Sequence, residues 1–230
     1  MTAHFKDSVG AQVISASAFE PAHEIAPTSL YRAFGKRLFD VAFVLIVAPL
    51  ALLLVALGAL SSAIGGMHWP FYAQVRVGLG GKAFKMLKIR TMVEDADARL
   101  AAHLAENPAA RREWEEKQKL ENDPRITKFG DILRKSSLDE MPQLWNVLKG
   151  DMSIVGPRPM MMDQRHLYPG TDYYLLRPGV TGPWQVSDRS QGSFAGRAQF
   201  DAEYNEALSL KNDLRILART VGVVLRCTGR

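Results

Sequence analysis

Two adjacent carboxylates, Asp139 and Glu140, lie where the sequence predicts the start of a helix. Pro142 is tolerated only in the first turn of a helix, so we expect the helix to begin near Leu138 or Asp139, and Gly150 to end it. The N–H groups of a helix start favour a carboxylate and, equally, a phosphate. Taken alone, the pair is more simply explained as an N-cap and a favourable first-turn charge.

Basic side chains on both sides of this pair change its interpretation. Arg134 precedes it, and Arg158 follows it between two prolines, whose fixed backbone limits where the guanidinium can point. Carboxylates, arginines and a helix start together predict a site for phosphoryl transfer. Every charge between residues 71 and 93 is also positive: Arg76, Lys82, Lys85, Lys88 and Arg90.

A second candidate for ligand binding is the Pro/Gly-rich segment 177–185. Its polar side chains, Arg177, Thr181 and Gln185, are of the kind that a loop offers to a ligand. The alternative is an ordinary surface turn. The glycines at 78–81 suggest a phosphate loop only weakly, because their spacing matches neither dinucleotide-binding nor nucleoside-triphosphate-binding motifs.

An apolar segment precedes all of these residues. The range 41–75 contains no Asp, Glu, Lys or Arg, and 41–60 is almost wholly apolar. As a helix, residues 41–60 would reach roughly 30 Å, the hydrocarbon thickness of a bilayer. The alternative is a buried core helix. A helix of this length that is apolar all round would need more apolar packing partners than we expect from a chain of 230 residues. The sequence therefore predicts a membrane helix.

Pro49 lies in the middle of this apolar segment and predicts a bend, because it has no N–H and its ring crowds the carbonyl of Leu45. Basic residues flank the segment on both sides, and positive charge favours the cytoplasmic side of a membrane. A helix that crosses the bilayer would place only one of the two basic flanks on the cytoplasmic side. We therefore expect residues 31–66 to form a re-entrant helix hairpin broken at Pro49, with both flanks cytoplasmic.

The rest of the chain predicts an α+β fold that is mainly helical. The range 71–92 alternates apolar and basic residues around a glycine cluster, as in a small β-hairpin, and 94–119 is typical of a helix interrupted at Pro108. Near the C-terminus, apolar residues at helical spacing from Leu210 to Leu225 oppose basic ones. This basic amphipathic helix could lie on anionic lipid or on the core. We expect a disordered tail over 1–30 and a catalytic domain over 67–230.

Composition excludes several classes of protein. The single cysteine, Cys227, allows no intrachain disulfide, and the five histidines lack metal-ligand spacing. No serine lies in a nucleophile elbow. The net charge of +5 suits nucleic-acid binding, but no recognised motif for it appears, so we expect no nucleic-acid partner.

Ordered motifs along the chain resemble those of the monotopic phosphoglycosyl transferases, also called bacterial sugar transferases. The resemblance covers about residues 34 to 227 and is strongest with members that begin exopolysaccharide synthesis with galactose-1-phosphate or glucose-1-phosphate. It rests on GKRLFD at 35–40, FKMLKIRTM at 84–92, DPRIT at 123–127, SLDEMPQL at 137–144, GPRP at 156–159 and RPGVTG at 177–182.

This resemblance implies a reaction and a place in the cell. A hexose-1-phosphate would pass from a UDP-sugar to undecaprenyl phosphate through a covalent aspartyl phosphosugar on Asp139, with release of UMP. Glu140 would act as a general base or help to hold Mg²⁺ near Asp139. The resemblance also places the protein at the cytoplasmic face of the bacterial inner membrane. The alternative is a non-catalytic membrane-bound module that binds anionic lipid or partner proteins.

The resemblance also assigns residues to the substrates. The phosphates would lie among four basic residues: Lys88, Arg90, Arg134 and Arg158. The nucleotide or sugar would contact a loop whose candidate residues are Arg177, Thr181, Gln185 and Arg189.

Overall fold

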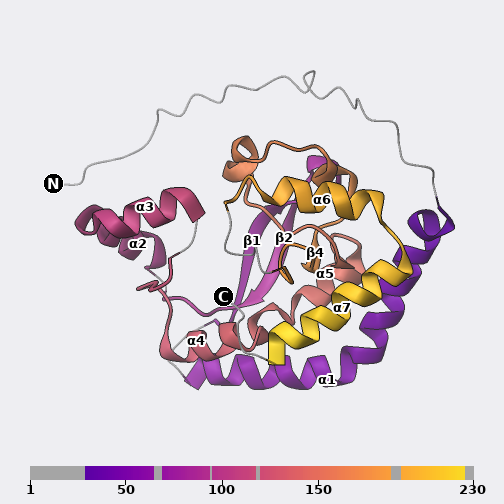
Figure 1. The fold of residues 1–230 in the computed structure, drawn as a ribbon. Coiled ribbons are helices and arrows are strands. Elements are labelled where there is room, and N and C mark those ends of the chain that lie inside the picture. The colour runs from indigo at the N-terminus through magenta and orange to yellow at the C-terminus, as the bar shows by residue number, and fades with distance from the viewer. Residues whose placement is uncertain (1–28, 65–68, 94, 118–119, 188–192, 226–230) are drawn as a thin grey trace.

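The computed structural model describes residues 29–64, 69–93, 95–117, 120–187 and 193–225. The predicted tail over 1–30 lies almost wholly outside this part of the chain. The fold is α+β and mainly helical, as expected (Figure 1). In chain order its main elements are α1 (Lys36–Ile64), β1 (Phe71–Val77), β2 (Ala83–Ile89), α2 (Ala96–Glu106), α3 (Pro108–Lys117), α4 (Lys128–Lys135), α5 (Gln143–Lys149), β3 (Ser153–Val155), β4 (Gly179–Thr181), α6 (Arg197–Glu206) and α7 (Leu210–Leu225).

Strands β1 and β2 form the predicted antiparallel hairpin, with Tyr72 opposite Lys88. A short 3₁₀ turn, Leu79–Gly81, joins them. Gly80 and Gly81 have φ angles of 64° and 77° there. Such angles favour glycine, which explains the glycine cluster in the sequence. The helix interruption at Pro108 is also confirmed, because α2 ends at Glu106 and α3 begins at Pro108.

A second pair of strands did not follow from the sequence. Strand β3 pairs in parallel with β4, which lies inside the Pro/Gly-rich segment 177–185. Gly156 and Gly179 bring the two backbones into close approach, because a Cβ at either position would collide with backbone atoms of the other segment. The segment is therefore partly a buried strand and not only a surface turn.

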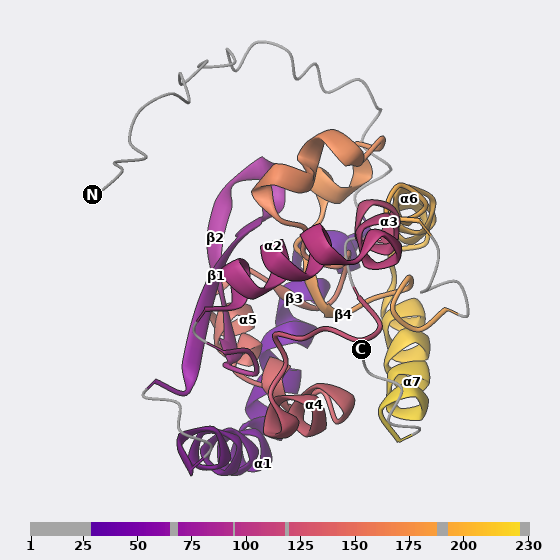
Figure 2. The same ribbon diagram turned by 90° about the vertical axis from the view of Figure 1, so that its left-hand side faces the viewer.

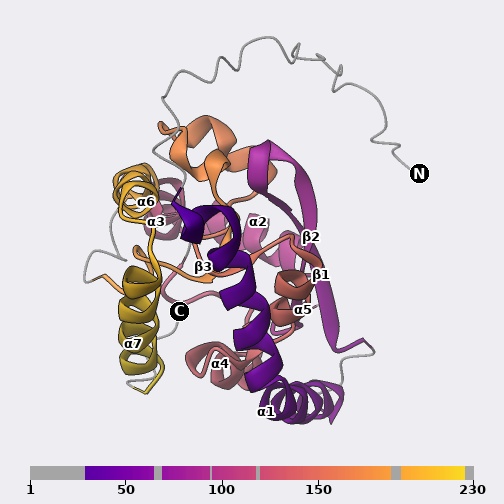
Figure 3. The same ribbon diagram turned by 90° about the vertical axis from the view of Figure 1, so that its right-hand side faces the viewer.

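Helix α1 is the one long apolar helix in the described part of the chain. The range Tyr31–Leu60 is long and apolar enough to cross a bilayer, and 17% of its most apolar window is buried. A core helix would be mostly buried, so the core-helix alternative does not describe α1. The predicted break at Pro49 takes a different form, because the helix continues through this residue and its two halves point in different directions (Figures 1 and 3). A proline that removes one N–H bends a helix when neighbouring turns keep its other bonds.

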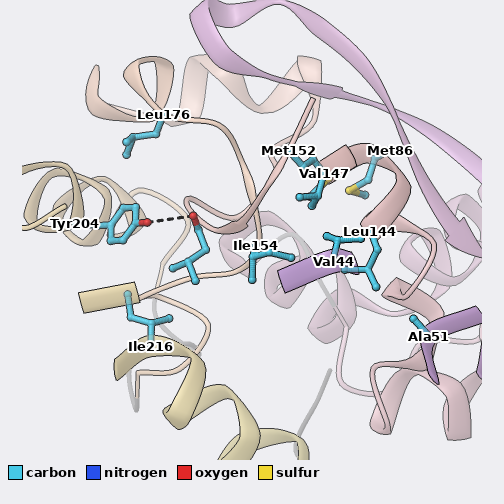
Figure 4. Close-up of a cluster of buried hydrophobic side chains, with 11 residues drawn as sticks. Val44, Ala51, Met86, Leu144, Val147, Met152, Ile154, Leu176, Tyr204 and Ile216 are labelled. Carbon is cyan, nitrogen blue, oxygen red and sulfur yellow. Dashed lines mark hydrogen bonds between the residues drawn. The ribbon is translucent and has the colours of Figure 1, made fainter. Parts of the chain in front are cut away.

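The first half of α1 is part of the hydrophobic core. Figure 4 shows Val44 of α1 facing Leu144 and Val147 of α5, with Ile154 of β3 beside them. Ile216 of α7 belongs to the same cluster. One core therefore joins the apolar helix to the domain that carries the candidate site.

Polar contacts fix the start of α1 as well. Asp213 of α7 is fully buried and accepts hydrogen bonds from Tyr31 Oη at 2.6 Å, Lys36 Nζ at 2.7 Å and Tyr204 Oη at 2.6 Å. Asp40 of α1 accepts from the Ile154 amide at 2.9 Å. Because a buried carboxylate needs these partners, the arrangement holds α1 and α7 in a defined relation.

Helix α7 confirms the predicted C-terminal helix, but its core face differs from the predicted stripe. Ile216 and Asp213 are buried, whereas Leu214 and Val221 of the stripe are 51% and 59% exposed. Helix α7 contacts β3 and β4 and places Ile216 in the core, with Leu217 of the stripe packed against the same cluster. The rest of the stripe at Leu214 and Val221 stays largely exposed.

Candidate active site

The backbone around Asp139 differs from the predicted helix start. Ser137 has a φ angle of 56°, and it is the only residue other than glycine in the described ranges with a positive φ. A 3₁₀ turn, Leu138–Glu140, follows it, and α5 begins only at Gln143. The amide of Glu140 bonds to the Ser137 carbonyl and that of Met141 to the Leu138 carbonyl, a spacing typical of 3₁₀ geometry.

The predicted helix start at Leu138 or Asp139 is therefore confirmed only as a short 3₁₀ turn, and the α-helix itself begins later. Pro142 precedes α5 as its N-cap and has no N–H with which to continue an α-helical pattern. Helix α5 is also only 7 residues long, so its dipole is no argument for an anion site. The charge of the site must come from side chains. Asp139 itself is 4% exposed.

Glu140 and Lys88 form an ion pair beside Asp139. Their side chains are 20% and 19% exposed, and Lys88 Nζ lies 2.7 Å from Glu140 Oε1. Burial raises the pKa of Asp139 and the charge of Glu140 raises it further, against the opposing effects of Lys88 and Arg134. Burial also acts to raise the pKa of Glu140, but Lys88 and Arg158 outweigh it and hold that pKa below its ordinary value. The two adjacent carboxyl groups therefore titrate differently.

A cavity of about 2010 Å³ contains this carboxylate pair. It is larger than most single-ligand pockets, so it has room for two substrates. The predicted phosphate-binding residues all line this cavity: Lys88, Arg90, Arg134 and Arg158.

Arg158 supplies positive charge that no acidic side chain in the described ranges neutralises by an ion pair within 4.0 Å. Its effect is seen on two neighbours. Burial, together with the charge of Arg158, lowers the pKa of Arg76 to about 10 and that of Arg197 to about 9. Three guanidinium groups therefore repel one another at one wall of the cavity. An anion bound there would relieve this repulsion.

Arg134 and Arg90 both have neighbours that interact favourably with their positive charge. Burial lowers the pKa of Arg134, and the charges of Asp139 and Asp123 oppose that effect. The guanidinium of Arg90 lies over the ring of Tyr72, 5.8 Å from its centre.

The structure places some of the predicted loop residues in the cavity and others outside it. Thr181 and Gln185 line the cavity, and the Thr181 hydroxyl lies 2.7 Å from that of Thr220 on α7. Arg177 does not line it, because its Nε donates to the carbonyl of Gly150 at the end of α5. Arg189 lies outside the described residues.

Two cavity residues were missed by the sequence argument. The guanidinium of Arg197 contacts the rings of Trp184 and Phe194, 4.3 and 4.4 Å from their centres, and its buried Nε has no hydrogen-bond partner in the described ranges. Gln143 is 2% exposed, and its buried Nε2 also lacks a partner there. Unpaired buried donors are rare, and they indicate a missing acceptor. The SLDEMPQL motif contains Gln143, whereas no local pattern marked Arg197.

The described ranges contain no group of three or more His, Cys, Asp or Glu side chains that could hold a metal ion. Asp139 and Glu140 offer two adjacent carboxylates. This is too little for a closed metal cage, but it fits Mg²⁺, which usually keeps waters and takes further oxygens from a substrate phosphate.

Comparison with known proteins assigns the chain that carries this cavity to a family. A family model described as bacterial sugar transferase matches residues 31–227, a range that contains α1, the carboxylate pair and all the cavity residues above. The chain belongs to the bacterial sugar transferase family. The expectation drawn from the ordered motifs is thereby confirmed.

Several curated relatives are similar over 85% of this chain. A UDP-galactose-lipid carrier transferase of Erwinia amylovora is 48% identical, and an undecaprenyl-phosphate galactose phosphotransferase of Salmonella typhimurium is 46% identical. The exopolysaccharide production protein ExoY of Sinorhizobium fredii is 44% identical. The match covers 41% of the first two relatives and 87% of ExoY.

Proposed function

We propose that this sugar transferase moves a hexose-1-phosphate from a UDP-sugar to undecaprenyl phosphate and so starts the synthesis of an exopolysaccharide or other surface glycan. The names of the relatives support the two substrates. One of them is a UDP-glucose:undecaprenyl-phosphate glucose-1-phosphate transferase of Caulobacter vibrioides, 36% identical to this chain. The observation that carries the proposal is a buried carboxylate, Asp139, in a cavity that also contains Arg158, which no acidic side chain in the described ranges pairs within 4.0 Å.

The proposed reaction has two steps. A carboxylate oxygen of Asp139 attacks the phosphorus that bears the sugar, the bond from this phosphorus to the bridging oxygen breaks, and UMP leaves with that oxygen. An oxygen of undecaprenyl phosphate then attacks the same phosphorus and displaces the Asp139 carboxylate. One phosphoanhydride replaces another, so no further energy source is needed, and a nucleophilic side chain divides one difficult transfer into two.

The surrounding side chains take distinct parts in this scheme. Arg158, Arg134 and Lys88 would stabilise the charge on the transferred phosphate. Gln143 and Arg197 would donate their unpaired N–H groups to oxygens of the bound diphosphate. Glu140 is a weak base because its pKa is lowered, so we assign it to electrostatic and metal-holding work rather than to proton abstraction.

Mg²⁺ would be held by Asp139 and Glu140 together with substrate oxygens. When bound, it would neutralise part of the negative charge of the diphosphate.

We propose further that α1 enters the bacterial inner membrane from the cytoplasmic face and returns to it. The basic flanks and the change of direction along α1 support this arrangement. Single cysteines introduced at Ser29 and Lys82, in a Cys227→Ser background, should both resist a membrane-impermeant thiol reagent in intact cells and react after lysis. Reaction of either one in intact cells would show that the chain crosses the bilayer.

The test of the reaction uses protein held in nanodiscs, with a UDP-sugar and no acceptor. We expect about one UMP per enzyme molecule, followed by continued turnover once undecaprenyl phosphate is added. Salt-sensitive lipid binding with no UMP release from any UDP-sugar would favour the non-catalytic membrane module instead.

The raised pKa of Asp139 predicts the pH dependence of the first step. The nucleophile must be deprotonated, so kcat/KM for UMP release should fall as pH falls through a pKa above the usual aspartate value of about 3.9. Glu140→Gln removes a charge that raises this pKa and frees Lys88 to lower it. The acid limb of the pH profile of kcat/KM should therefore move to lower pH in this variant, whatever happens to the maximal rate.

Glu203→Gln is the matched control, because Glu203 lies on α6 and does not line the cavity. An acid limb that moves equally in both variants, or to higher pH in Glu140→Gln, would contradict the proposed coupling of the two carboxyl groups.

A further inference from the structure

The cavity that contains Asp139 continues beyond its charged end. Two helices line this continuation with apolar side chains. Helix α1 contributes Phe43, Val47, Leu50, Ala51 and Leu54, and α7 contributes Leu214, Leu217, Ala218, Val221 and Val224.

The two helices diverge as they leave the start of α1. Asp213 ties α7 to Tyr31 and Lys36 at one end. Farther along, α4 lies between α7 and the second half of α1 (Figures 2 and 3). Ile154 and Val180 also line the cavity between the two helices. These residues form a groove with apolar walls in the same cavity as the carboxylate pair.

Helix α7 presents chemically distinct faces. The residues of its predicted apolar stripe that line the groove include Leu214 and Val221, which are half-exposed or more. Lys211, Arg215 and Arg219 do not line it. Exposed apolar surface beside a polar site usually marks a binding surface.

We propose that α1 and α7 form the two walls of a groove that binds the first isoprene units of the polyprenyl phosphate acceptor. The inference rests on the proposed function and adds α7 to the acceptor site. A lipid phosphate needs cations at one end and apolar contacts behind them, and this cavity is lined by both. A UDP-sugar is polar along its length and gains nothing from such walls.

The same walls lead toward the apolar surface of α1. Leu50 lines the groove and is 61% exposed, and Leu52 and Leu53 next to it are 69% and 56% exposed. The stretch of α7 from Leu214 to Val224 is about 15 Å long. An isoprenoid chain could therefore pass from the cations to the bilayer without leaving apolar contact.

The test compares two leucines on α7. Leu214 and Leu210 are 51% and 44% exposed, but only Leu214 lines the groove. Leu214→Asn should raise the KM for undecaprenyl phosphate by about tenfold through lost apolar contact. UMP release without acceptor should stay within about twofold of the wild type, because the first step does not use the groove. Leu210→Asn should change neither quantity.

Equal effects of the two substitutions on the acceptor KM would contradict the proposed groove. An equally large loss of acceptor-free UMP release in Leu214→Asn would contradict it as well. Acceptor length gives a second criterion. Methyl phosphate, which carries no isoprene unit, should be indifferent to Leu214→Asn, because it has no chain to contact the wall.

A binding measurement separates failure of the groove from failure of the proposed function. An undecaprenyl phosphate with a diazirine on its first isoprene units should label peptides from 43–54 and 214–224 in nanodiscs, with no turnover required. Labelling there without any UMP release would retain the groove and reject the reaction. UMP release with labelling confined to other peptides would retain the reaction and reject the groove, and would favour α7 as a surface for the bilayer or a protein.

Discussion

Asp139→Asn is expected to release no UMP above background when a UDP-sugar is supplied without acceptor. The amide lacks the charge needed to attack phosphorus, so no covalent phosphosugar forms, and turnover with acceptor should fall by at least about 10³-fold. Intact-protein mass spectrometry of wild type after acid quench should show a hexose phosphate adduct, absent from the variant. Quantified UMP gives the second measurement.

Two controls make this result specific. Asp139→Asn replaces a buried carboxyl group, whose pKa is raised by burial, by an isosteric amide, so the thermal midpoint should change little. Asp163→Asn affects a cavity-lining carboxylate outside the proposed reaction and should leave UMP release unchanged. Full turnover by Asp139→Asn, or an adduct on another residue, would mean that a different group or a direct displacement carries the transfer.

Arg158→Ala is expected to lower kcat/KM for UMP release by about 10²- to 10³-fold, the usual cost of removing one preorganised group that stabilises transition-state charge. Its stability should behave differently from its activity. The charge of Arg158 repels Arg76 and Arg197 and attracts Glu140, so its removal relieves two unfavourable interactions and loses one favourable one, and no ion pair within 4.0 Å to an acidic side chain in the described ranges is lost with it. The thermal midpoint should therefore stay equal or rise.

Arg158→Lys and Arg165→Ala complete this experiment. Lysine keeps the charge but not the planar fork of donors, so partial activity is expected. Arg165 lies over the ring of Tyr174 and does not line the cavity, so its loss should leave UMP release unchanged. An Arg158→Ala protein that loses activity and stability together would indicate a structural role for this side chain.

The sequence predicted the hairpin of β1 and β2, the interruption at Pro108 and the end of α5 at Gly150, because each depends on residues close together in the chain. The structure gives Gly150 a φ angle of 90°, the left-handed conformation expected at a helix end. Prediction failed where a local pattern competed with tertiary contacts. Helix α5 starts later than expected, and α7 turns Ile216 rather than its full apolar stripe toward the core.

By itself, the sequence determined the family, the apolar helix and the carboxylate pair with its neighbouring cations, because motif order, hydropathy and short spacings are properties of the linear chain. Only the tertiary structure decided which donors share the cavity. Arg197 reaches it through contacts with Trp184 and Phe194, while Arg177 turns away to the end of α5. The apolar side chains of α1 and α7 come to line one cavity only after folding, because burial of Val44 and Ile216 in one core brings together helices that lie far apart in the chain.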